Sequence, residues 1–182
     1  LGLKLAIVLD THTHADHITA SGALREKTNC QIMMGAPSEN QCVDKLLKDQ
    51  ECIQIDELKI IALLTAGHTK DSFCYYVHDR IFTGDTLLIR GTGRTDFQGG
   101  DVKQQYQNIT TKLFTLPDST LVYPGHDYKG LTVSTILEER KYNPRLQVEN
   151  AMQYQDIMYN LNLPKPKLMD IAVPANLKCG LA

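Results

Sequence analysis

Short apolar runs separated by polar turns dominate the first half of the chain. Residues 3–9 form a run that is apolar apart from Lys4, which predicts a buried strand. Runs rich in β-branched and aliphatic residues predict strands over 31–34, 51–55 and 58–64. Between them, residues 38–48 form a polar segment with the composition of a helix. Residues 72–77 and 80–83 predict a hairpin that turns at His78 and Asp79.

Helical patterns dominate the second half. Residues 101–114, 133–142 and 148–161 are helical in pattern, and residues 120–123 predict a short strand. An earlier helix is predicted over 16–27, and the chain ends in a tail punctuated by prolines. We find no internal repeat and no long linker. The pattern therefore predicts one α/β domain over residues 1–182, with a helical C-terminal segment over 132–182.

The turn after the first predicted strand carries the clearest chemistry. The string T-H-T-H-A-D-H at 11–17 places His12, His14, Asp16 and His17 close together. Packed imidazoles and carboxylates without a partner would carry a desolvation penalty. This cluster therefore predicts a metal site.

Three more residues of the same kind follow downstream. His68, Asp85 and His126 stand in the strings G-H-T, G-D-T and P-G-H-D, each next to a predicted strand. Loops at strand ends are where a rigid scaffold presents ligands. Together the seven residues could supply two adjoining metal sites, because imidazole and carboxylate suit zinc, iron and manganese. His78, in a polar stretch, is predicted to be a surface residue.

Composition narrows the function classes. The chain has 182 residues, of which 42% are hydrophobic and 22% charged, and its net charge is −2. These values are ordinary for a globular protein. Without a Lys/Arg cluster there is no electrostatic footprint for nucleic acid, and no apolar run approaches the roughly 18 residues that span a bilayer. We therefore predict neither a nucleic-acid nor a membrane partner.

The number and spacing of the cysteines predict free thiols. There are five, an odd number, and they are scattered without a C-x-x-C pair. This pattern argues against a disulfide framework and for a reducing compartment.

The ordered set of ligand-type residues resembles the metallo-β-lactamase superfamily. Within it, the chain is most similar to the persulfide dioxygenase branch, the ethylmalonic encephalopathy protein group, and next to glyoxalase II. The strings that carry this likeness run almost to the C-terminus. They are F-T-G-D-T-L-L-I-R-G-T-G-R-T-D-F-Q at 82–98, Y-P-G-H-D-Y-K-G at 123–130, S-T-I-L-E-E-R at 134–140, N-P-R-L at 143–146, N-L-N-L-P-K-P at 160–166 and V-P-A-N at 173–176.

The resemblance implies a metallo-β-lactamase-type αββα sandwich with the metal at one edge. Members of the family usually have strands ahead of the point where this sequence begins. We therefore expect a domain that lacks its first N-terminal strands and is less stable than a chain extended upstream. Thr92 and Lys70 stand where the family more often has Cys and Pro. Neither is a ligand-type residue.

The resemblance also implies the metal and its ligands. In the persulfide dioxygenases one Fe(II) is held by two His and one Asp, which correspond to His12, His68 and Asp85. This facial triad leaves open positions for the substrate sulfur and for dioxygen. The other ligand-type residues would orient the triad, or would hold a second metal as in glyoxalase II, with zinc or a mixed pair as the alternative. They are His14, Asp16, His17, His126 and Asp127.

The implied reaction is the oxidation of glutathione persulfide by O2 to sulfite and glutathione, in sulfide catabolism. Arg94 and Tyr128 match glutathione-contacting positions of the related hydrolases, and Arg145 could pair with a glutathione carboxylate. Arg90 is a further candidate, although Arg90 and Arg145 could instead pair with acidic residues of the chain. Two alternatives stay open, namely a hydroxyacylglutathione hydrolase with a dinuclear site and an inactive truncated form.

The resemblance implies a mitochondrial matrix location in a eukaryote or a cytoplasmic one in a bacterium, with no targeting segment visible. A homodimer is possible.

Overall fold

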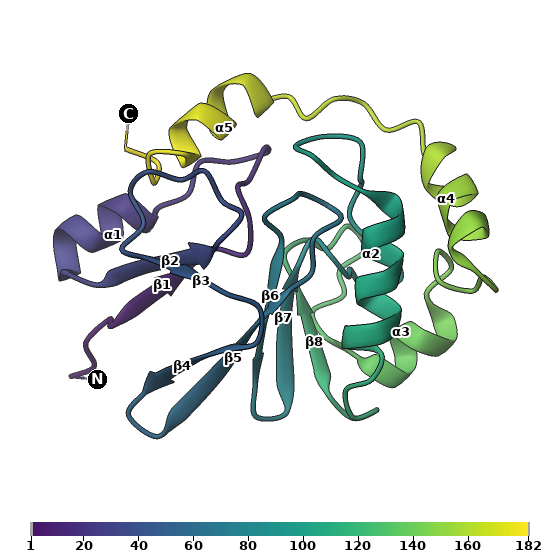
Figure 1. The fold of residues 1–182 in the computed structure, drawn as a ribbon, viewed down its shortest axis with the longest axis horizontal. Coiled ribbons are helices and arrows are strands. Elements are labelled where there is room, and N and C mark those ends of the chain that lie inside the picture. The colour runs from purple at the N-terminus through teal and green to yellow at the C-terminus, as the bar shows by residue number, and fades with distance from the viewer. Residues whose placement is uncertain (1, 182) are drawn as a thin grey trace.

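The strands form two sheets in the computed structural model, which describes residues 2–181 (Figure 1). The first sheet is parallel, in the order β1-β2-β3, and the second has the order β4-β5-β6-β7-β8-β9, antiparallel except between β7 and β8. The strands of the first sheet are β1 (Ile7–Leu9), β2 (Gln31–Gly35) and β3 (Lys45–Leu47). Those of the second are β4 (Glu51–Ile55), β5 (Leu58–Leu64), β6 (Phe73–Val77), β7 (Arg80–Gly84), β8 (Leu121–Pro124) and β9 (Ser134–Thr135).

Helices lie outside both sheets. Figure 1 shows α1 beside the first sheet, α2 and α3 beside the second, and α4 beyond α2; the chain then crosses the top of the view to α5, which lies on the side of α1. The helices are α1 (Ser21–Thr28), α2 (Val102–Asn108), which continues into a π-helical turn (Ile109–Leu113), α3 (Ile136–Tyr142), α4 (Ala151–Tyr159) and α5 (Met169–Asn176).

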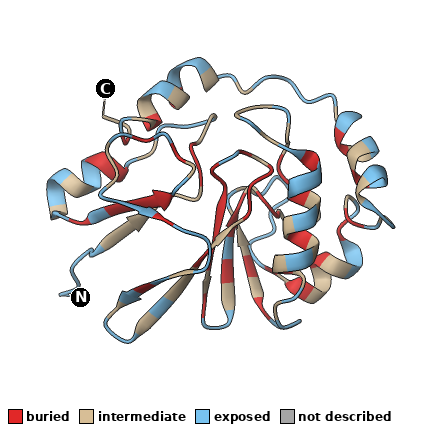
Figure 2. Ribbon diagram, viewed as in Figure 1, coloured by how far each residue is buried: buried red, intermediate tan, exposed pale blue. Residues whose placement is uncertain are grey.

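Alternation along β6 divides the core into two layers. Phe73 and Tyr75 belong to the cluster between the sheets, together with Met33 of β2, whereas Cys74 belongs to the cluster beneath the helices. Successive strand residues point to opposite faces of a sheet, so one strand contributes to both layers, and β6 is buried along most of its length (Figure 2). The two sheets pack closely at Gly35. A Cβ at this position would lie 2.1 Å from the Phe73 ring.

Most predicted strands are confirmed, including the hairpin that turns at His78. The helical pattern over 101–114 is also confirmed, and its N-cap is Asp101, whose carboxylate accepts from the N–H groups of Lys103 and Gln104. The helix predicted over 148–161 is confirmed in a shorter form, α4.

No helix forms over residues 38–48, although the polar composition of this segment suits one. The segment contains β3, which pairs with β2, and Asp44 accepts a hydrogen bond from the Ile32 N–H at 2.7 Å. Polar side chains that bond to the backbone in this way compete with helix formation. Tertiary pairing therefore overrides the local composition.

Three other boundaries differ from the prediction. The run 3–9 is a strand only from Ile7, and Leu3 is exposed, because β1 pairs with β2 alone. The helix predicted from residue 16 begins at Ser21, and residues 133–142 begin as β9 before α3 starts at Ile136. The C-terminal tail contains a helix, α5, which its proline-punctuated sequence did not lead us to expect.

The cysteine prediction is partly wrong. Cys42 and Cys179 form a disulfide, with their Cα atoms 6.0 Å apart and their positions 137 apart in sequence. Cys30, Cys52 and Cys74 are free thiols, as predicted. An odd count of scattered cysteines cannot reveal such a pair, because only the fold brings the two residues together.

The disulfide predicts a stability effect. We expect oxidised protein to show three free thiols after denaturation, from Cys30, Cys52 and Cys74. Reduction, or the pair Cys42→Ala and Cys179→Ala, should lower the free energy of unfolding by about 2–4 kcal/mol in a urea titration, because a long unfolded loop regains its freedom. Cys52→Ala is the control and should leave it unchanged. Five reactive thiols in unreduced protein would contradict this expectation.

Candidate metal centre

The seven ligand-type residues meet at one edge of the sandwich. β5, β7 and β8 end at this edge and β6 begins there, since β6 is antiparallel to both neighbours and β8 is parallel to β7. His68 lies in the β5–β6 loop, Asp85 directly follows β7, and His126 follows β8. The turn after β1 brings His12 to the same place from the other sheet. The edge predicted from the strand-end positions is therefore the one that forms.

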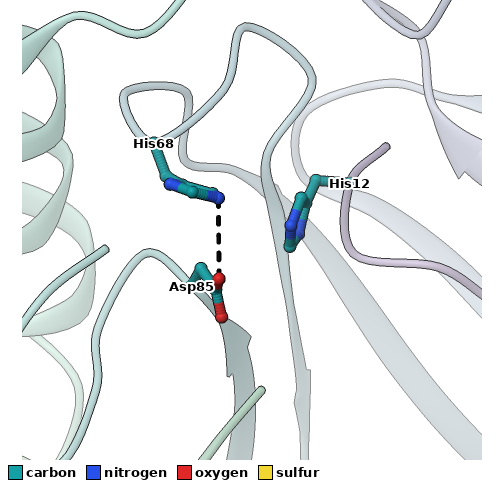
Figure 3. A group of neighbouring side chains, drawn as sticks. All are labelled: His12, His68 and Asp85. Atoms are coloured by element: carbon teal, nitrogen blue, oxygen red, sulfur yellow. Dashed lines mark ion pairs between the residues drawn. The ribbon is translucent and has the colours of Figure 1, made fainter. Parts of the chain in front are cut away.

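His12, His68 and Asp85 converge on one point (Figure 3). Each offers a ligand atom, and these atoms lie within 4.8 Å of one another. The Nε2 atom of His68 is 3.6 Å from Oδ2 of Asp85, and the rings of His12 and His68 have centroids 4.9 Å apart. These three are the candidate ligands of a superfamily metal site.

Both imidazoles are prepared to bind a cation. Nδ1 of His68 lies 2.7 Å from the Arg94 carbonyl, which can only accept, so the ring proton sits on Nδ1 and Nε2 keeps its lone pair. Nδ1 of His12 is engaged by the Thr11 hydroxyl at 3.0 Å. Burial and the nearby His14 lower the pKa of His12 well below its ordinary value. A neutral ring is the form that binds metal.

The carboxylate of Asp85 is held in its ionised form. Burial alone would raise its pKa, but the hydrogen bond from His126 and the imidazoles nearby bring it down to about 2. Nδ1 of His126 lies 2.7 Å from Oδ1 of Asp85. That contact leaves Oδ2, the oxygen nearer His68, available to a metal.

His126 bridges two carboxylates. Its Nε2 lies 2.9 Å from Oδ2 of Asp16, so both ring nitrogens are used. The hydrogen bond to Asp85 is the main cause that raises the pKa of His126 to about 9, against the effect of burial. A protonated ring donates from both nitrogens.

His14, Asp16 and His17 form a second group of ligand-type atoms within 4.8 Å of one another. Nδ1 of His14 is buried and has no hydrogen-bond partner among the described residues. A buried, unpaired ring nitrogen normally costs about 1–3 kcal/mol. A cation at this edge would satisfy it, and the donor set of imidazoles and carboxylates fits a first-row metal.

Asp71 joins the two ligand-bearing loops, a role the sequence did not predict. Its buried carboxylate accepts from the Thr13 N–H at 3.0 Å, the Thr13 hydroxyl at 2.6 Å and the Thr69 hydroxyl at 2.7 Å. Thr13 and Thr69 each follow a candidate ligand. The one sequence feature that could have indicated this role is the position of Asp71, three residues after the candidate ligand His68.

Gly93 allows the loop after Asp85 to pass close to the centre. A Cβ at this position would lie 2.1 Å from the Asp85 carbonyl and 2.9 Å from Nδ1 of His68. Close approach of this kind needs glycine.

A cavity of about 550 Å³ opens beside the triad. His12, His68 and Asp85 line it, and so do all four predicted substrate-binding residues, Arg90, Arg94, Tyr128 and Arg145.

The arginines differ in their internal pairing. Arg90 forms an ion pair with the buried Glu139, and Arg94 pairs with Asp96 through two contacts of 2.7 and 2.8 Å. Arg145 donates to the Thr92 carbonyl but forms no ion pair with the residues that the structure describes. Of the three arginines, Arg145 is therefore the one best placed to meet an anionic ligand.

Tyr128 and Asp127 occupy the rim. The Tyr128 ring is 80% exposed and stacks on His126, with centroids 6.0 Å apart. The Asp127 carboxylate accepts from the N–H groups of Lys129 and Leu131 at 3.0 and 2.7 Å, which holds this loop.

The C-terminal tail forms part of the cavity wall. Leu163, Pro164 and Pro166 line it, and Arg94 donates to the carbonyls of Leu163 and Pro164 at 3.1 and 2.6 Å. The sequence singled out N-L-N-L-P-K-P at 160–166 without assigning it a role. Only the fold shows that this string covers the site.

Comparison with known proteins gives the family. The metallo-beta-lactamase superfamily model matches residues 2–126. The mitochondrial persulfide dioxygenase ETHE1 of Homo sapiens is 46% identical over 184 residues, covering 100% of this chain and 72% of the relative. The crystal structure of ETHE1 from Myxococcus xanthus is 52% identical, with a TM-score of 0.96, covering 99% of this chain and 80% of that one.

A hydrolase is more distant. A probable hydroxyacylglutathione hydrolase of Schizosaccharomyces pombe is 36% identical over 130 residues, which is 69% of this chain and 50% of the relative. The αββα fold and the likeness to the dioxygenase branch are thus confirmed. In addition, no helix within residues 2–181 has the length and apolar character to cross a membrane. The chain therefore belongs to the metallo-β-lactamase superfamily and, within it, to the family of the persulfide dioxygenases.

Proposed function

We propose that this chain is a persulfide dioxygenase that oxidises glutathione persulfide with O2 to sulfite and glutathione. The observation that carries the proposal is the full-length likeness to the persulfide dioxygenases, combined with a triad of two imidazoles and one carboxylate. In the balanced reaction the outer sulfur is oxidised, dioxygen accepts the electrons, and water supplies the remaining oxygen of sulfite. Glutathione leaves as the thiol.

His12, His68 and Asp85 would hold one Fe(II). When bound, such an iron supplies redox chemistry with open positions for two reactants. The residues around it fix the geometry of the ligands. The Arg94 carbonyl sets the tautomer of His68, and His126 fixes one oxygen of Asp85. Outer contacts of this kind orient ligands and tune their basicity.

The cavity suits a glutathione moiety. Arg145 offers a half-buried guanidinium for a carboxylate, where a two-pronged contact is strongest. Tyr128 offers an exposed phenol at the rim. Arg94 pairs with Asp96 and donates to the Pro164 carbonyl, so it joins the loop after Asp85 to the C-terminal tail that lines the cavity. We therefore propose Arg145 and Tyr128 as direct contacts and Arg94 as a residue that organises the wall.

A hydroxyacylglutathione hydrolase is the second candidate. The His14, Asp16 and His17 group favours it, because a second metal there would complete a dinuclear site for thioester hydrolysis. Against it, the likeness to the hydroxyacylglutathione hydrolase covers 69% of this chain, whereas the likeness to the persulfide dioxygenase covers all of it.

Metal content tests the proposed centre. We expect purified protein to contain about one iron per chain and little zinc by elemental analysis. His68→Ala or Asp85→Ala should abolish iron retention, since losing one of three ligands leaves the metal weakly held. His78→Asn is the matched control, because His78 lies in the β6–β7 turn, and it should keep the wild-type iron content. Two zinc ions in active protein would instead favour the hydrolase.

Substrate choice tests the reaction. We expect glutathione persulfide to drive oxygen uptake with sulfite formation, and S-D-lactoylglutathione to be turned over poorly. The reason is that efficient thioester hydrolysis uses a metal hydroxide that a second Lewis acid helps to hold. Oxygen-electrode traces and a sulfite assay give one readout, and anaerobic thioester cleavage gives the other. Robust anaerobic hydrolysis without persulfide-dependent oxygen uptake would refute the dioxygenase.

Single substitutions test the glutathione contacts. Arg145→Ala and Tyr128→Phe should raise KM with a small effect on kcat, as for groups that bind the ground and transition states alike. For Arg145→Ala we expect about a tenfold increase, which corresponds to about 1.4 kcal/mol. Arg80→Ala, in an exposed pair with Asp79, is the control. A fall in kcat at constant KM would place Arg145 in a different role.

A further inference from the structure

Asn176 contacts the turn that carries the second group of ligand-type residues. It is the last residue of α5 and is buried. Its Nδ2 donates to the carbonyls of His14 and His17, both at 2.8 Å, and its Oδ1 accepts from the Thr19 N–H at 2.8 Å. Both protons of the amide and its oxygen are therefore engaged with one irregular turn.

This turn is connected to Asp85 by a chain of hydrogen bonds. Asp16 lies between the two carbonyls that Asn176 holds, and its carboxylate is 2.9 Å from Nε2 of His126. Nδ1 of His126 is in turn 2.7 Å from Asp85. The backbone position that Asn176 fixes thus reaches a candidate metal ligand through two side chains.

The end of α5 is itself held from the opposite side. Nδ2 of Asn40 donates to the Asn176 carbonyl at 2.6 Å, and the Gln41 N–H donates to the Leu177 carbonyl at 3.1 Å. The Gly22 N–H donates to the Cys179 carbonyl at 2.9 Å, and the disulfide joins Cys179 to Cys42. These hydrogen bonds and the disulfide hold the C-terminal end of α5, and with it Asn176, in place.

We propose that Asn176 is a positioning residue for the metal centre, acting through Asp16 and His126 on Asp85. This inference rests on the metal centre of the proposed function. The side chain must be an amide, because it donates to two carbonyls and accepts from one N–H. An aspartate in its place would turn a carboxylate toward the His14 and His17 carbonyls, and an alanine would leave three backbone groups unpaired.

The test measures cobalt(II) binding by metal-free protein. Asn176→Ala and Asn176→Asp should bind cobalt about tenfold more weakly than wild type, the lower end of the effect of lost outer contacts. The visible absorption of the bound cobalt should also change. Asp170→Ala, an exposed position on the same helix, is the matched control and should bind as wild type does. Circular dichroism and urea titration report whether each variant is folded.

A double variant tests the path. If Asn176 acts through Asp16, Asp16→Ala should weaken cobalt binding by itself, and adding Asn176→Ala should cause little further loss. Independent, additive losses would overturn the proposed path. Unchanged affinity and spectrum in folded Asn176→Ala protein would overturn the positioning role.

If the Asn176 variants do not fold, Asn40→Ala tests the positioning role of Asn176 instead. It removes the contact that fixes the Asn176 carbonyl but leaves the amide in place. A smaller loss of cobalt affinity supports the inference, and wild-type affinity overturns it. Wild-type protein that fails to bind cobalt would be a separate result, since it would refute the metal centre itself.

Discussion

The three hydrogen bonds to the Asp71 carboxylate hold the site together. His12 comes from a turn after the first sheet, and His68 from a loop of the second, so neither sheet alone can form the triad. Asp71 binds Thr13 and Thr69, the residues that follow these two ligands. Charge-assisted bonds of this kind are among the strongest in proteins. Asp71 thus ties the turn that carries His12 to the loop that carries His68.

Around this junction, each candidate ligand depends on a contact from a distant part of the chain. The tautomer of His68 is set by the Arg94 carbonyl, and the orientation of Asp85 by His126. Asp16, which bonds to His126, stands on a turn held by Asn176 of the last helix. The C-terminal third is therefore part of the metal centre's support and, through Leu163 and Pro164, part of the cavity wall.

The local pattern of apolar and polar residues predicted those strands and helices whose own sequence carries a clear hydrophobic signal. Runs rich in β-branched and aliphatic residues identified β4 to β8, because strands buried on one or both faces carry that signal in their own sequence. The pattern failed at residues 38–48, where pairing with β2 and the bond from Asp44 to Ile32 override a helical composition. It failed again at α5, whose internal Pro174 is tolerated because the helix is short and docks through Asn176.

The sequence by itself determined the candidate ligand set and the family, because the spacing of His12, His14, Asp16 and His17 and the three glycine-flanked ligand-type residues are local features. It also indicated Arg145 and Tyr128, through strings shared with relatives. Only the tertiary structure decided which groups are free to act. Arg90 and Arg94 are paired internally while Arg145 is not, and Cys42 meets Cys179. Asp71 and Asn176 gained their roles in the same way, since a hydrogen bond between residues far apart in sequence exists only once the chain has folded.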